Sequence, residues 1–87
     1  MRKAITLRAR LRDRSAKFDI DLLDLSVTGF RAEADYTLHA GDIVWINLPG
    51  LAGIEATIAW REGRVIGAAF RQPLYPAVFD HLTAMGR

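Results

Sequence analysis

Cysteine is absent from the 87-residue chain, which excludes disulfide bonds, thiolate metal sites and a cysteine nucleophile. No apolar stretch reaches the length needed to span a membrane. The start, Met1-Arg2-Lys3, leads into an alternating pattern and not into the apolar run of a signal peptide. We therefore expect a cytoplasmic domain with no membrane insertion, a location that suits a chain without cysteine.

Signals of catalysis are also missing. The two histidines, His39 and His81, have no metal-ligand spacing to each other or to carboxylates. No serine lies in a nucleophile elbow, and no glycine-rich loop matches a phosphate-binding loop. We expect no catalytic residue, no metal site and no cofactor, and hence a protein that is not an enzyme.

The hydrophobic content of 51% is that of a folded chain, and the length allows one domain over residues 1–87. The net charge is only +2, but seven of the 12 basic residues lie within the first seventeen positions. This bias suggests an anionic partner, although a solvated strand face explains it as well. The seven are Arg2, Lys3, Arg8, Arg10, Arg12, Arg14 and Lys17.

Apolar and polar residues alternate over residues 5–12 and again over 16–22, which predicts two half-buried strands. A tight turn at Asp13-Arg14 would join them into a hairpin. That turn places each inward-facing residue of one strand opposite an inward-facing residue of the other. On the outer face it places Arg8 opposite Asp19, and we expect Asp19 and Asp21 to be ion-pair partners of the arginines of the first strand. The expected pairs are Leu11 with Ala16, Ala9 with Phe18, Leu7 with Ile20, and Ile5 with Leu22.

Four more short strands are predicted around residues 30–34, 43–48, 54–60 and 65–70, with turn signals between them. Pro76 then opens a helix over about 76–86 with an apolar stripe of Val78, Phe79, Leu82 and Met85. The pattern is that of a small barrel or sandwich over about 4–71 with one covering helix. The expected core comprises Ile5, Leu7, Leu11, Phe18, Ile20, Leu22, Phe30, Ile46, Ile58 and Phe70.

A polar motif, Asp24-x-Ser26-x-x-Gly29, directly follows the second predicted strand. Asp and Ser side chains can fix a turn through bonds to the main chain, and glycine permits positive φ or a close approach. By itself this hexapeptide is a common turn. Trp60, next to Arg61, is either a partly exposed stacking platform or a core residue at the barrel end.

Together these features resemble the PilZ family, the bacterial receptors for the second messenger cyclic di-GMP. Asp24-x-Ser26-x-x-Gly29 looks like the family signature, and the stretch from Ala59-Trp60 to Gly67-Ala68-Ala69-Phe70 resembles a later strand pair. The resemblance covers essentially the whole chain. It implies an all-β fold, a six-stranded antiparallel barrel with one short C-terminal α-helix.

The resemblance also implies that cyclic di-GMP binds between the signature and an N-terminal Arg-x-x-x-Arg switch. Arg2 fits the second arginine of that motif, whereas the first would precede Met1, so we expect weak binding. Lys3 adds charge without a bidentate fork. The implied ligand residues are Arg2, Lys3, Asp24, Ser26, Gly29 and Trp60, with Arg8, Arg10 and Arg12 as additional candidates for phosphate contacts.

The expected function is a cyclic di-GMP receptor or adaptor that signals through an unidentified protein partner. The alternative is a degenerate PilZ domain that acts as a protein-protein interaction module without nucleotide binding. Nucleic-acid binding is disfavoured, because the arginines of the first strand alternate with inward aliphatic residues and not with aromatic ones.

Overall fold

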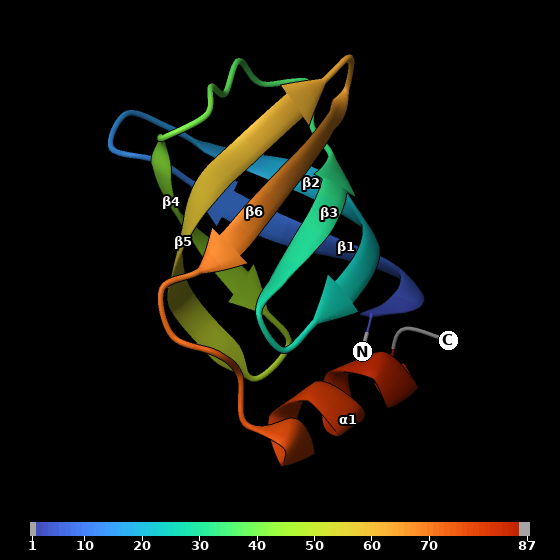
Figure 1. The fold of residues 1–87 in the computed structure, drawn as a ribbon. Helices are drawn as coiled ribbons and strands as arrows, with labels where there is room; N and C mark the ends of the chain where they lie inside the picture. The colour runs from blue at the N-terminus through green and yellow to red at the C-terminus, as the bar shows by residue number, and fades with distance from the viewer. Residues whose placement is uncertain (1, 86–87) are drawn as a thin grey trace.

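The computed structural model describes residues 2–85, and at Arg2, Ala52 and Met85 it describes the backbone alone. Six antiparallel strands close into a barrel in the order β1-β2-β3-β6-β5-β4, and one helix follows them (Figure 1). The expected fold class is confirmed. The elements are β1 Arg2–Arg12, β2 Lys17–Ser26, β3 Gly29–Glu33, β4 Ile43–Leu48, β5 Leu51–Glu62, β6 Val65–Phe70 and α1 Pro76–Met85.

The register of the first hairpin differs from the expected one. Its turn is centred on Arg14 and Ser15, because the Asp13 carboxylate accepts hydrogen bonds from the backbone N–H groups of Ser15 and Ala16 at 2.7 and 2.8 Å. These bonds lower the pKa of Asp13. Relative to the expected pairing, β2 is shifted by two residues along β1. Such a shift keeps every side chain on the same face of the sheet, so the alternation of apolar and polar residues cannot distinguish the two registers. The observed pairs are Leu11 with Phe18, Ala9 with Ile20, Leu7 with Leu22, Arg8 with Asp21 and Arg10 with Asp19.

Most of the expected core is buried, but Phe18 and Leu7 are only partly buried. Phe18 lies beside the hairpin turn and stacks on Tyr36 from the loop after β3, with ring centroids 4.2 Å apart. Leu7 borders a surface hollow next to an irregularity in β1. The buried members of the expected set are Ile5, Leu11, Ile20, Leu22, Phe30, Ile46, Ile58 and Phe70.

Helix α1 lies across one end of the barrel (Figure 1). Phe79 and Leu82 are buried and Val78 is half-buried, as the helical stripe predicts, while the Met85 side chain and Gly86 lie outside the described residues. The buried side chains join the barrel core, so α1 acts as a cover for that core. Within residues 2–85, no helix is long and apolar enough to cross a membrane.

Candidate functional site

The signature residues lie on the outer surface of β2 and β3 in two adjacent cross-strand rows. The first, the motif row, consists of Ala4, Asp24, Arg31, Gly67 and Trp60, which are consecutive register partners on β1, β2, β3, β6 and β5. Register partners on neighbouring strands lie close enough for their side chains to interact. The barrel therefore places Asp24 and Trp60, which are far apart in the sequence, in one row with Arg31 and Gly67 between them.

The second row, the turn row, consists of Arg2, Ser26, Gly29, Ala69 and Thr57. Arg2 pairs with Ser26, and Gly29 pairs with Ala69, which in turn pairs with Thr57. The Ser26 hydroxyl links the two parts of the row, because it accepts the Gly29 N–H at 3.1 Å. The structure thus places the Arg2 backbone beside the signature, within β1 and not before it.

Three register irregularities surround the motif row. They lie between Ala4 and Leu7 on β1, between Leu22 and Asp24 on β2, and between Ile58 and Trp60 on β5. A β-bulge adds a residue to one strand, so the side chains beyond it change face. The one on β2 places Asp24 on the outer face of the sheet beside Arg31 while Leu25 faces the core, and the one on β5 turns Trp60 outward from the phase of Ile58.

A groove of about 510 Å³ runs along the outside of β3, β6 and β5. Its size is in the range of small-molecule sites. Glycine and alanine provide much of the lining, while Arg31 and Trp60 provide the large side chains. Trp60 is 38% exposed, which rules out the alternative that it is a core residue at the end of the barrel. The lining residues are Thr28, Gly29, Phe30, Arg31, Ala59, Trp60, Gly67, Ala68 and Ala69.

Ser26 holds the turn of the signature together. Its buried hydroxyl accepts hydrogen bonds from the N–H groups of Thr28 and Gly29 at 3.2 and 3.1 Å, and it lies 3.3 Å from the Gly29 carbonyl oxygen. Gly29 has no positive φ. It is needed for clearance, because a Cβ there would overlap the carbonyl oxygen of Ala68 on β6.

Replacing Ser26 with alanine should lower the free energy of unfolding by about 1–3 kcal/mol, because two backbone N–H groups of the turn lose their acceptor. Urea denaturation followed by tryptophan fluorescence measures this change. The matched control is Ser15→Ala in the exposed β1–β2 turn, for which we expect a change within about 0.5 kcal/mol. Equal effects at the two serines would contradict the role given to Ser26.

Asp24 is 4% exposed and forms an ion pair with Arg31 on the neighbouring strand. The Arg31 Nε donates to Asp24 Oδ2 at 2.5 Å, and Nη2 lies 2.5 Å from the same oxygen. A buried carboxylate needs such a partner, since an unpaired buried charge is strongly unfavourable. Arg31 was not singled out in the sequence, although pairing across the turn at 26–29 would have placed it opposite Asp24.

Lys3 lies away from the groove. Its register partner is Leu25, which is buried, and its ammonium lies 5.5 Å from the centroid of the Phe79 ring on α1. Lys3 therefore connects the first strand to the helix through a cation–π contact. This position gives it no part in the lining of the groove.

Arg8, Arg10 and Arg12 of β1 also lie elsewhere. In the closed barrel, β1 is separated from β6 by two strands in either direction, so its outer face is on the far side from the groove. Arg8 lies 3.8 Å from Asp19 and 3.9 Å from Asp21, and Arg10 lies 3.4 Å from Asp19. The predicted pairing of Asp19 and Asp21 with these arginines is thus confirmed.

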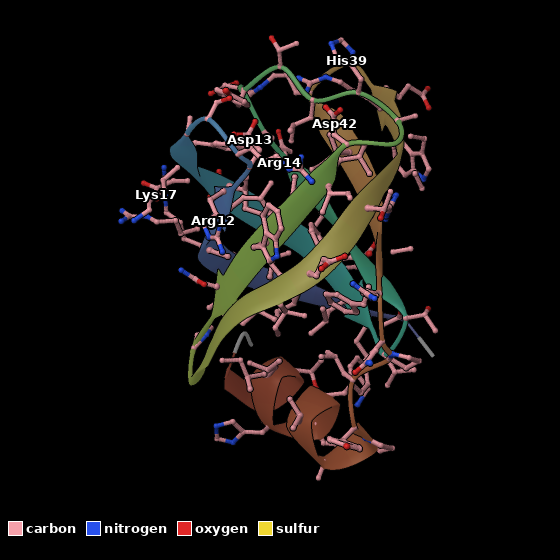
Figure 2. All side chains as sticks on the ribbon, turned by 90° about the vertical axis from the view of Figure 1, so that its left-hand side faces the viewer. Arg12, Asp13, Arg14, Lys17, His39 and Asp42 are labelled. Carbon is pink, nitrogen blue, oxygen red and sulfur yellow. The ribbon has the colours of Figure 1, made fainter. Side chains whose placement is uncertain are left out.

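Arg12 lies over the ring of Trp45 on β4, 4.5 Å from its centroid. Figure 2 shows Arg12, Arg14 and Lys17 in the part of the barrel away from α1. Arg8, Arg10 and Arg12 are not among the described residues that line the groove. Nor do residues 2–85 contain a group of three or more His, Asp or Glu side chains placed to hold a metal ion.

The family model of the PilZ domain matches residues 1–85, nearly the entire chain. The chain belongs to the PilZ domain family. A search of curated proteins gives no match to it. The closed six-stranded barrel and the C-terminal helix agree with the PilZ fold, and PilZ domains are generally receptors for cyclic di-GMP.

Proposed function

We propose that this PilZ domain is a cytoplasmic receptor or adaptor for cyclic di-GMP, which binds over the motif row and the turn row. The observation that carries the proposal is the groove, which adjoins the signature and has Trp60 along its side. Because this surface combines an indole ring with charged groups, it suits a ligand that contains both flat bases and phosphates.

The chemistry of each residue matches part of that ligand. The exposed part of the Trp60 ring offers an aromatic face for a guanine. Arg2, whose backbone is in register with Ser26, is of the residue type that binds phosphate through charge-assisted hydrogen bonds. Ser26 and Gly29 contribute by shaping the turn between these two partners.

Calorimetric titration with cyclic di-GMP at physiological salt tests the proposal. We expect wild-type binding that is saturable and weakened by Arg2→Ala. The loss of each charge-assisted hydrogen bond costs about 1.5–3 kcal/mol, or roughly a ten- to hundredfold loss of affinity. Arg64→Ala is the matched control, because Arg64 is an exposed arginine in an ion pair that lies outside the groove.

Two results would contradict this assignment. Submicromolar binding that Arg2→Ala leaves unchanged would reject the role of Arg2 and the expectation of a weak site. Absence of binding at high ligand concentration would reject the receptor function. The protein-interaction alternative would then be preferred, and its supporting observation is the 79% exposed ring of Tyr75 beside the half-buried Leu74 and Val78.

A further inference from the structure

The tip of the β1–β2 hairpin carries positive charge that has no acidic partner. Arg12 ends β1, Arg14 lies in the turn and Lys17 begins β2 (Figure 2). None of the three forms an ion pair with another residue in the described part of the chain. The arginines that do pair with an aspartate or glutamate are Arg8, Arg10, Arg31, Arg64 and Arg71. The hairpin tip is therefore a cationic surface open to an anionic partner.

The pairing of charges changes at this tip. In the two preceding rows on the same face, an arginine of β1 is opposite an aspartate of β2, namely Arg8 with Asp21 and Arg10 with Asp19. In the next row the register partner of Arg12 is Lys17. Like charges directly opposite each other destabilise a strand pair, whereas opposite charges stabilise it. An aspartate at position 17 would continue the stabilising pattern, so stability does not explain the lysine.

The fold holds these charges in fixed positions. In the turn, the Asp13 carboxylate accepts the N–H groups of Ser15 and Ala16, while the Asp13 N–H donates to the Ala16 carbonyl at 3.0 Å. Arg12 packs over the ring of its register partner Trp45, 4.5 Å from the centroid. A stacked guanidinium keeps the N–H donors on its edges available, because they lie in its own plane. Arg12 is therefore oriented in advance for an acceptor, which lowers the entropic cost of binding.

Apolar side chains lie next to the charged ones. The exposed Ile43 and the half-buried Trp45 both lie on the outer face of β4, because the residues that alternate with them are buried. A hollow of about 340 Å³ separates the hairpin turn from the start of β4, and its lining consists of Asp13, Arg14, Ser15, Gly41, Asp42 and Ile43. Cations beside apolar surface suit a peptide, which can offer carboxylates and apolar side chains together.

Two carboxylates at the border of this surface restrict the class of partner. Asp13 and Asp42 line the same hollow as Arg14, and each accepts a backbone N–H. A nucleic-acid strand or an anionic membrane presents its negative charge in a continuous array, so it would also meet these carboxylates. A protein segment carries fewer charges and can place them over the cations alone. The arrangement therefore favours a protein over the other two classes.

We propose that the hairpin tip docks an acidic segment of a partner protein through Arg12, Arg14 and Lys17, with Ile43 and Trp45 as its apolar contacts. A carboxylate of the segment placed between Arg12 and Lys17 replaces one repulsion by two attractions, and arginine forks bind carboxylates well. None of these five residues lines the groove. The inference is therefore independent of cyclic di-GMP binding, and it gives the adaptor a partner of defined chemistry.

Lys17→Asp tests the inference, because it restores the arginine–aspartate pairing of the neighbouring rows. We expect the midpoint of urea denaturation to rise while docking weakens. The probe is a fluorescein-labelled peptide of glutamate, leucine and serine, titrated at low salt and followed by anisotropy. Its affinity should fall about tenfold or more in the variant. Arg64→Asp, an equal change of charge in the β5–β6 turn, should leave the affinity little changed.

Three further probes establish what the surface recognises, and all are measured without cyclic di-GMP. The same peptide with glutamine in place of glutamate should not bind. Single-stranded DNA and vesicles of phosphatidylcholine and phosphatidylserine should bind more weakly than the acidic peptide. Tighter binding to DNA or vesicles would assign the surface to those partners and overturn the inference. Failure of the wild type to bind the acidic peptide, or equal binding by Lys17→Asp, would overturn it as well and would leave the receptor function untouched.

Discussion

Replacing Phe30 with alanine should lower the free energy of unfolding by about 3–5 kcal/mol, the range for deleting a fully buried aromatic ring. Phe30 is 1% exposed, and its ring lies 5.7 Å from that of Phe70, centroid to centroid. Its neighbours belong to a closed sheet, which limits how far they can collapse into the space left behind. Because domains are stable by only about 5–15 kcal/mol, this variant should be close to unfolding at 37 °C.

Phe18→Ala is the matched control for this prediction. Phe18 is half-buried and stacks on Tyr36 in a loop, so its removal exposes less core and should cost about half as much or less. Urea denaturation of both variants, followed by fluorescence, gives the two values. If Phe18→Ala cost as much as Phe30→Ala, or if Phe30→Ala left the transition unchanged, the assignment of the barrel core would be wrong.

Replacing Gly29 with alanine should disturb both the fold and the site. The added Cβ would overlap the Ala68 carbonyl oxygen and come within 3.2 Å of Ala69 Cα, so β3 and β6 would have to separate. Overpacking of this kind costs about 1–3 kcal/mol. Because both backbones border the groove, we also expect cyclic di-GMP binding to fall in the same variant.

Gly67→Ala provides the comparison, since its Cβ would meet a side chain and not a backbone. The Trp60 ring can move aside, so this variant should lose less stability than Gly29→Ala. Its tryptophan emission should nevertheless change, because Trp60 would leave its place over Gly67. Denaturation curves and emission spectra of both variants measure these effects. A greater loss of stability in Gly67→Ala would contradict the clearance argument.

The sequence was sufficient to predict the strands but not how they are paired. Alternation assigns each residue to a face, and a shift by two residues preserves that assignment, so the first hairpin was placed two residues out of register. The Asp13 side chain favours the observed register, because it accepts hydrogen bonds from the backbone N–H groups of Ser15 and Ala16 in the turn. The pattern of apolar residues does not reveal a hydrogen bond of this kind.

The bulges explain what could not be predicted about the site. From the phase of Ile54, Ala56 and Ile58, Trp60 should point inward, but the irregularity at Ala59 turns it to the surface. The same effect on β2 turns Asp24 toward Arg31. The signature could be found from its residue types, whereas its neighbours in the groove depend on a pairing order that brings β6 next to β3.

The position of the bound ligand tests the central claim most directly. Cyclic di-GMP is titrated into the ¹⁵N-labelled domain, and the shifts of the amide and indole signals are followed by NMR. We predict the largest changes at Gly29, Arg31, Gly67, Ala69 and the Trp60 indole, with little change at Arg8, Arg10 and Arg12 on the far side of the barrel. Changes centred on Arg8, Arg10 and Arg12 or around Tyr75, or no changes at saturating ligand, would contradict the account.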